Sequence, residues 1–158
     1  MIQKKYISYM QFENHMMTLC KELRLRNIHK RVSAIYGFPR GGLPIAVHLS
    51  HHLNVPLLLN FFELDSYDSI LAVDDIIDSG KTFIEFMERV DLMDLNVYSA
   101  SLYYKKQSTF LPDIYLHETP DWIVFPWETK YSKTAPDRYD IFSNIGLNNQ
   151  NIEQELEH

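Results

Sequence analysis

The stretch ILAVDDIIDSGKT, residues 70–82, is the part of the sequence that decides the fold. An apolar run leads directly into two adjacent carboxylates, Asp74 and Asp75. Such a run is typical of a strand that is buried on both faces of a parallel sheet. Because an isolated carboxylate is costly to remove from water, both acids need partners at the end of this strand. Successive strand residues face opposite ways, so the two acids need not share a role.

A small-residue turn, DSGKT, follows the acids and leads into a helical pattern. Its backbone N–H groups and the hydroxyls of Ser79 and Thr82 can surround a phosphate, because a helix N-terminus favours an anion. Lys81 adds positive charge. A P-loop would need a glycine five residues before Gly80, where the chain has Asp75, so we reject an ATPase site. An ordinary capped turn is the alternative for DSGKT alone, but it gives the paired acids no purpose.

Strand-like and helix-like segments alternate along the chain, which predicts an α/β fold with a parallel sheet covered on both sides. The expected strands are residues 32–38, 55–62, 69–77, 96–104 and 122–127. The expected helices are residues 9–28, 43–54 and 81–93. In such a sheet ligands bind beyond the carboxyl ends of the strands, where the acids and the turn lie.

Helical spacing also predicts which side chains point into the core. In the first helix these are Met10, Phe12, Met16, Leu19 and Leu23. In the second helix they are Leu43, Val47 and Leu49, and in the third they are Phe83, Phe86, Met87 and Val90.

Composition and charge narrow the class of protein. The chain has 158 residues, of which 46% are apolar, which is enough for one globular domain. The net charge of −6 argues against a general nucleic-acid binder. The single cysteine, Cys20, excludes an internal disulfide and fits a reducing compartment. With no signal-like or membrane-spanning apolar segment, we expect a cytoplasmic protein without membrane insertion. One domain over residues 1–147 and a polar tail over 148–158 are expected.

A second glycine-containing loop, FPRGG, follows the strand expected at 32–38. Gly41 and Gly42 allow an anion to approach the backbone closely. Arg40 can bind phosphate oxygens. A plain turn is the alternative for this motif alone, but the loop lies where the predicted sheet would bind ligands.

Two later segments carry further candidate residues: SLYYKK at 101–106 and TPDWIVFPWE at 119–128. Taken singly, Trp122 would be a core residue and a lysine after a strand would be a solvated surface group. Lys105 ends the strand expected at 96–104, and Lys106 is close enough that the choice between the two lysines stays open.

The four motifs, in their order along the chain, resemble the type I phosphoribosyltransferases over roughly residues 5–130. The similarity is strongest to the 6-oxopurine branch and to its small bacterial xanthine–guanine enzymes. The resemblance implies an α/β fold with about five mostly parallel strands, a small hood and bound Mg²⁺. It also implies that the chain binds phosphoribosyl pyrophosphate and a purine base or nucleotide, and that it forms a homo-oligomer.

The resemblance also implies a role for each matching residue. The ribose 5′-phosphate would bind to the turn of Asp78, Ser79, Gly80, Lys81 and Thr82. The pyrophosphate would bind to the loop of Arg40, Gly41 and Gly42. Asp74 and Asp75 would face the ribose, with Asp75 holding the metal. The purine would stack on Trp122, reach the backbone of Ile123 with its 2-position, and accept a hydrogen bond from Lys105 at its 6-oxygen.

The implied reaction displaces pyrophosphate from the anomeric carbon of the ribose by a purine ring nitrogen. Its transition state resembles an oxocarbenium ion, as in glycoside cleavage. Carboxylates near the ribose stabilise the positive charge, and Asp78 exchanges a proton with N7 of the purine. The catalytic acids are therefore Asp74, Asp75 and Asp78.

One feature departs from the family pattern. Relatives carry a long lid loop that begins at a Ser-Tyr pair, whereas here Ser66 and Tyr67 are followed almost at once by the next expected strand. We therefore expect a shortened lid and an open site. Two functions follow: an active purine phosphoribosyltransferase, or a lid-less relative that binds the donor or a purine nucleotide as a sensor or interaction module. The tyrosine-rich segment after Thr129 could replace the lid, in which case deleting it would abolish activity.

Overall fold

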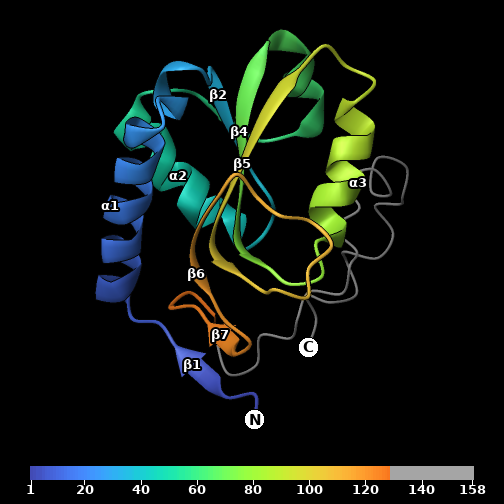
Figure 1. The fold of residues 1–158 in the computed structure, drawn as a ribbon. Coiled ribbons are helices and arrows are strands. Elements are labelled where there is room, and N and C mark those ends of the chain that lie inside the picture. Colours follow the sequence, from blue (N-terminus) through green and yellow to red (C-terminus); the bar gives the residue numbers. More distant parts are fainter. Residues whose placement is uncertain (129–158) are drawn as a thin grey trace, which may run out of the picture.

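The computed structural model describes residues 1–128 of the chain (Figure 1). Its elements, in chain order, are β1 (Lys4–Tyr6), α1 (Tyr9–Leu25), η1 (Ile28–Lys30), β2 (Ala34–Gly37), α2 (Gly42–Leu53), β3 (Leu57–Leu58), η2 (Phe61–Ser66), β4 (Ser69–Ile77), α3 (Lys81–Val90), β5 (Asn96–Tyr104), β6 (Ile114–Glu118) and β7 (Trp122–Val124). The predicted domain end at 147, the tail 148–158 and the lid role suggested for residues after Thr129 lie outside the described residues.

The centre of the molecule is a five-stranded sheet with the order β3-β2-β4-β5-β6, in which every neighbouring pair is parallel. Helices α1 and α2 cover one face and α3 covers the other (Figure 1). Alternate residues of β4 feed the two cores: Leu71 and Val73 pack under α1 and α2, whereas Ile70 and Ala72 pack under α3. This arrangement confirms the predicted α/β fold and explains why β4 is apolar throughout.

The fifth strand of this sheet is β6, so the prediction that 122–127 supplies it was wrong. Only one residue of β6, Ile114, is buried, because β6 is an edge strand with a solvated side. Its mixed sequence, IYLHE, therefore lacks the apolar run that marks a central strand. β7 instead pairs with β1 in a separate two-stranded parallel sheet. We call this two-stranded sheet the hood.

The strand predicted at 55–62 is also shorter than expected. β3 contains only Leu57 and Leu58, and the chain then turns into η2. The Glu63 carboxylate accepts hydrogen bonds from the backbone N–H groups of Leu59 and Asn60 at 3.1 and 3.0 Å, which ends the strand. Residues 59–68 are thus the whole connection from β3 to β4, at the position where relatives were expected to carry the lid.

Most of the predicted inward faces are correct. Phe12, Met16, Leu19 and Leu23 of α1 and Phe83, Phe86 and Val90 of α3 are buried. Two positions were wrong: Met10 is 72% exposed and Val47 is 42% exposed. In α2 the predicted Leu49 is buried and Leu43 is half-buried, whereas the other buried side chains are Ile45 and Ala46, since α2 packs on the sheet as well as on α1. Within residues 1–128, no helix is long and apolar enough to cross a membrane.

Candidate active site

A cavity of about 650 Å³ opens at the carboxyl ends of the sheet strands. The residues that line it are Pro39, Arg40, Gly41, Asp74, Asp75, Ile76, Ile77, Asp78, Ser79, Gly80, Lys81, Thr82, Phe83, Lys105, Trp122, Ile123, Phe125, Trp127 and Glu128. Every site residue singled out from the sequence is among them except Gly42. Four segments that are far apart in the chain therefore meet at one site, as expected for ligand binding in a parallel sheet.

The acid pair at the end of β4 is electrostatically strained. The Asp74 carboxylate accepts a hydrogen bond from the backbone N–H of Asp75 at 2.9 Å, and the Asp75 carboxylate accepts one from Ile76 at 2.8 Å. Burial raises the pKa of Asp75 to about 6, and the negative charge of Glu128 acts in the same direction. Burial and the neighbouring Asp75 carboxylate raise the pKa of Asp74 well above its ordinary value. A cation or a hydroxyl-rich ligand would relieve this strain.

The FPRGG loop packs directly against this acid pair. A Cβ atom added at Gly41 would collide with the Asp75 carboxylate, and one added at Gly42 would lie 2.5 Å from the Val73 carbonyl oxygen. The two glycines therefore let the start of α2 lie against the end of β4. The peptide bond between Pro39 and Arg40 is cis, and both residues face the cavity.

The DSGKT turn becomes the first turn of α3. Gly80 is the N-cap and has a φ of 87°, a left-handed conformation that favours glycine. The backbone N–H of Lys81 donates to the Ser79 hydroxyl at 3.3 Å. Lys81 also forms an ion pair with Glu85 at 3.8 Å, but both side chains are more than half exposed, so this pair contributes little to stability. The turn thus has the helix N-terminus and the cation expected of an anion site.

The segment after β5, residues 105–110, holds the DSGKT turn from the side. Both the backbone N–H and the hydroxyl of Thr109 donate to the Ser79 carbonyl oxygen at 3.0 Å. The Phe110 ring stacks on Phe83 with 4.7 Å between the ring centroids. We call residues 105–110 the bracing loop. It makes the shape of the turn depend on a segment that the sequence patterns did not connect with it.

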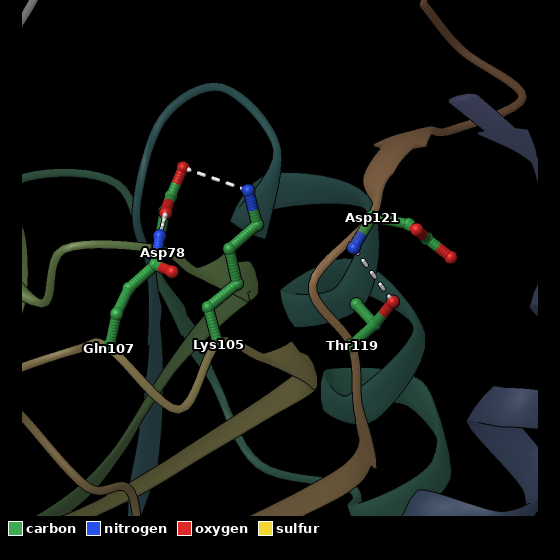
Figure 2. Close-up of polar contacts among 5 residues, drawn as sticks. All are labelled: Asp78, Lys105, Gln107, Thr119 and Asp121. Carbon is green, nitrogen blue, oxygen red and sulfur yellow. Dashed lines mark hydrogen bonds and ion pairs between the residues drawn. The ribbon is translucent and has the colours of Figure 1, made fainter. Parts of the chain in front are cut away.

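Two side chains of this segment bind the Asp78 carboxylate (Figure 2). The Lys105 ammonium lies 3.2 Å from Oδ2, and the Gln107 amide donates to Oδ1 at 3.1 Å. Lys105 is buried and lines the cavity, whereas Lys106 is exposed and does not. Burial thus singles out Lys105 of the two adjacent lysines. Sequence reasoning missed Gln107, because a glutamine in a polar loop carries no pattern of its own.

The opposite wall of the cavity is formed by the hood. Trp122 is 43% exposed and borders the cavity, so it is not the core residue that its type alone would suggest, whereas Ile123 is buried. The backbone N–H of Trp122 donates to the Gln3 carbonyl oxygen at 2.8 Å. The preceding turn is closed by the Asp121 N–H, which donates to the Thr119 hydroxyl at 3.1 Å (Figure 2). Residues near the chain start therefore orient Trp122.

Three further lining residues were quoted in the sequence motif but assigned no role: Phe125, Trp127 and Glu128. The rings of Phe125 and Trp127 stack with centroids 5.0 Å apart and an interplanar angle of 6°. The Glu128 carboxylate accepts a hydrogen bond from the Phe125 N–H at 2.7 Å. The FPWE string therefore folds back on itself, which a strand pattern does not predict.

The donor set suits Mg²⁺ bound together with a substrate. Among residues 1–128, no group of three or more histidine, cysteine or acidic side chains is arranged to hold a metal by itself. Mg²⁺ commonly binds through one or two carboxylates and completes its coordination with water and substrate phosphates. The strained pair of Asp74 and Asp75 offers that minimal set of carboxylates at the edge of the cavity.

Comparisons with known proteins agree with this geometry. The family model of the phosphoribosyl transferase domain matches residues 67–134. A xanthine-guanine phosphoribosyltransferase of Cereibacter sphaeroides is 28% identical, over 66% of this chain and 74% of that protein. The purine phosphoribosyltransferase of Pyrococcus horikoshii is 30% identical, with a TM-score of 0.69 over 80% of this chain and 95% of that one. A xanthine-guanine-hypoxanthine phosphoribosyltransferase of Helicobacter pylori is 27% identical, with a TM-score of 0.70 over 80% and 94% of the two chains.

Proposed function

This chain belongs to the phosphoribosyltransferase family, and on that premise we propose that it transfers the 5-phosphoribosyl group from phosphoribosyl pyrophosphate to a 6-oxopurine. The products are a purine nucleotide and pyrophosphate. The observation that carries the proposal is that one cavity joins an acidic, phosphate-type turn to an aromatic wall through Lys105 and Asp78.

The donor half of the cavity has groups of the right chemistry for each part of the sugar phosphate. The turn of residues 78–82 offers backbone N–H groups, hydroxyls and an ammonium to the 5′-phosphate. Arg40 and the close backbone of Gly41 offer cationic and N–H contacts to the pyrophosphate. Asp74 and Asp75 line the same cavity and offer carboxylate oxygens as acceptors to the ribose hydroxyls.

The acceptor half suits a flat ring with an acceptor at one edge. Trp122 is a half-exposed aromatic on which a purine can stack, and such stacking is worth about 1–3 kcal/mol per base. The buried ammonium of Lys105 can donate to a 6-oxygen but cannot accept from a 6-amino group. We therefore infer 6-oxopurines, namely xanthine, guanine and hypoxanthine, as the acceptor class.

Mg²⁺ is the cofactor that we propose, with Asp75 as its protein ligand. When bound, it would supply neutralisation of the charge that develops on the leaving pyrophosphate. The chain's own residues do the remaining work. Arg40 and the FPRGG backbone orient the pyrophosphate, and Asp74 and Asp75 stabilise positive charge on the ribose. Asp78 takes or returns a proton at N7 while another purine nitrogen forms the bond to the anomeric carbon and the bond to pyrophosphate breaks.

The test is the release of pyrophosphate from phosphoribosyl pyrophosphate in the presence of Mg²⁺, with xanthine, guanine, hypoxanthine or adenine as the acceptor. Release that requires a 6-oxopurine, and that is lost in Asp78→Asn, is the expected result. Release with adenine as good as with hypoxanthine would contradict the role of Lys105. Repeating the assay with a chelator tests the metal, and unchanged release would contradict the Mg²⁺ proposal.

A second function is favoured by one observation, the short connection over residues 59–68. Phe61 and Leu64 of this segment are buried in the core under α3, so these two side chains anchor the segment to the body of the protein. If the connection over residues 59–68 supplies no lid, the chain binds phosphoribosyl pyrophosphate or a purine nucleotide as a sensor. Calorimetric binding of the donor without release of pyrophosphate would identify this function and exclude the transferase.

A further inference from the structure

The Asp78 carboxylate is held at both oxygens by the bracing loop. Lys105 lies 3.2 Å from Oδ2 and Gln107 lies 3.1 Å from Oδ1 (Figure 2). The two partners differ in their surroundings. The Lys105 side chain is only 9% exposed, whereas Gln107 is exposed. The buried ammonium is the partner that faces the cavity, and the amide is the partner on the solvent side.

Lys105 has two acceptors to serve in the proposed reaction. In this structure it binds Asp78, but a bound 6-oxopurine would present its 6-oxygen to the same ammonium. An ammonium that turns toward the purine leaves Oδ2 of Asp78 free for the purine N7–H. Asp78 would then keep a single partner, the Gln107 amide on Oδ1. A hydrogen bond to a charged group is strong enough to keep such a carboxylate oriented.

The backbone around Gln107 fixes its reach. The Lys105 N–H donates to the Ile77 carbonyl oxygen at 2.9 Å, and the Thr109 N–H donates to the Ser79 carbonyl oxygen at 3.0 Å. The turn between them is closed by the Ser108 N–H, which donates to the Lys105 carbonyl oxygen at 2.8 Å. The backbone on either side of Gln107 is therefore held to Ile77 and Ser79, the two residues that flank Asp78. A side chain carried by this backbone can orient Asp78 without touching the substrate.

We propose that Gln107 is the positioning residue for Asp78, and that the Lys105–Asp78 ion pair opens when a 6-oxopurine enters while Gln107 keeps the carboxylate in place. This inference rests on the proposed transferase function. It assigns to the bracing loop a part in selecting the purine. A purine with an oxygen at position 6 and an N–H at position 7 replaces both halves of the ion pair, because its oxygen binds Lys105 and its N–H binds Asp78. A purine that cannot do so leaves Lys105 and Asp78 paired.

The experiment compares Gln107→Ala, Gln107→Glu and Gln107→Lys with the wild-type chain in steady-state transfer to hypoxanthine. The Ala variant removes the donor, the Glu variant also adds a charge that repels Asp78, and the Lys variant restores a donor. Lys106→Ala is the matched control, because Lys106 lies on the same turn, is exposed and does not line the cavity. The thermal unfolding temperature of each variant is recorded as a check on folding.

We expect Gln107→Ala to lower kcat about tenfold, the low end for a hydrogen bond to a charged group, with little change in the KM for phosphoribosyl pyrophosphate. Gln107→Glu should be at least as impaired, Gln107→Lys should recover part of the rate, and Lys106→Ala should match the wild type. A wild-type kcat in Gln107→Ala would overturn the proposal. So would an equal loss in kcat and donor affinity with a lowered unfolding temperature, since that result means a structural role only.

A failure of the transferase function is distinguishable from a failure of this inference. If the wild-type chain transfers nothing, calorimetric binding of inosine monophosphate, a 6-oxopurine nucleotide, replaces the rate as the readout. Weaker nucleotide binding in Gln107→Ala than in Lys106→Ala, with equal binding of phosphoribosyl pyrophosphate, supports the positioning role. Equal nucleotide binding by the two variants, or no nucleotide binding by the wild type, overturns it.

Discussion

At the residue scale, Asp75 combines a position that destabilises its charged form with a proposed role in binding a metal. It ends an apolar strand, is packed against Gly41 and lies near the charges of Asp74 and Glu128. Without a ligand, this position disfavours the ionised carboxylate. The stability that the folded chain gives up here is recovered by whatever cation binds, because binding to the folded state alone stabilises it.

Asp75→Asn is expected to make the ligand-free protein more stable at neutral and higher pH. The folded pKa of about 6 lies above the ordinary value of 3.8. The folded chain therefore binds the proton more tightly, and the free energy of unfolding decreases as the pH rises from the lower value through the higher one. The gain is about 3 kcal/mol at about pH 8, at 1.4 kcal/mol per pKa unit, and it disappears below about pH 4.

Urea unfolding of the two proteins across this pH range, without Mg²⁺ or substrate, provides the measurement. A variant that is less stable than the wild type at about pH 8 would contradict the prediction. The same variant is expected to lose transfer activity, so the two readouts should change in opposite directions.

Gly41→Ala tests the packing of the FPRGG loop on the acid pair. The new Cβ atom would collide with the Asp75 carboxylate, so we expect a loss of about 1–3 kcal/mol in unfolding free energy and weaker binding of phosphoribosyl pyrophosphate. The control is the same substitution in an Asp75→Ala background, where the collision partner is absent. Equal losses of stability in both backgrounds would show that the contact is not responsible.

At the scale of elements, the proposed acceptor site depends on the hood. β1 is exposed along its whole length, yet its pairing with β7 orients Trp122 at the edge of the cavity. Strand pairing rather than side-chain packing thus determines where this aromatic ring lies. Changes in the hood should weaken binding of the purine and leave binding of phosphoribosyl pyrophosphate unchanged.

Deleting residues 1–6, which removes β1 and leaves the buried Ile7, should raise the KM for the purine with little effect on the KM for phosphoribosyl pyrophosphate. The Trp122 N–H loses its acceptor, the Gln3 carbonyl oxygen, and β7 loses its only strand partner within residues 1–128, while the Ile7 N–H still donates to the Val124 carbonyl oxygen. Deleting residues 1–2 alone is the control, since both precede the strand. A rise in the KM for phosphoribosyl pyrophosphate as large as that for the purine would mean that the hood contributes to both the donor half and the acceptor half of the cavity.

Trp122→Ala is expected to raise the KM for the purine about tenfold, because stacking on one aromatic ring is worth about 1–3 kcal/mol. Donor binding should be unchanged, and the exposed aromatic Tyr9, replaced by Ala, provides the control. Steady-state kinetics with hypoxanthine as the varied substrate measure the effect. An unchanged purine KM would remove Trp122 from the acceptor site.

For the whole molecule, the connection over residues 59–68 is too short to supply the long lid loop expected from the family pattern. This segment leaves β3, buries Phe61 and Leu64 under α3 and enters β4 directly. It is therefore part of the packed body on the α3 side. An enzyme that cannot exclude water loses both electrostatic strength and protection of its activated donor.

We accordingly expect the protein to hydrolyse phosphoribosyl pyrophosphate slowly to ribose 5-phosphate and pyrophosphate when Mg²⁺ is present and purine is absent. Water then takes the place of the purine nitrogen at the anomeric carbon. Ribose 5-phosphate formation, followed over time beside an Asp75→Asn control, measures this side reaction. A complete lack of hydrolysis in a preparation that transfers to purine would show that the closed site excludes water by another segment.

The elements that the sequence predicted best are those whose pattern is local. β4 and β5 have the predicted bounds, because each is a long run of strand-forming residues between polar turns. β1 and β6 escaped prediction, since one is fully exposed and the other buries a single residue. Residues 122–124 of the segment 122–127 do form a strand, β7, but we expected it in the main sheet, because apolar residues that wall a cavity look the same as apolar residues inside a sheet.

The amino-acid sequence by itself determined the α/β class, the central acidic strand, the phosphate-type turn and the family. These follow from periodicity and from motifs that lie within a few residues of one another. Only the tertiary structure decided which lysine enters the cavity, that Gln107 holds Asp78, and that β1 orients Trp122. The reason is physical. Burial and hydrogen bonds arise between segments that are distant in the chain, and a local sequence pattern does not indicate which distant segment will pack against it.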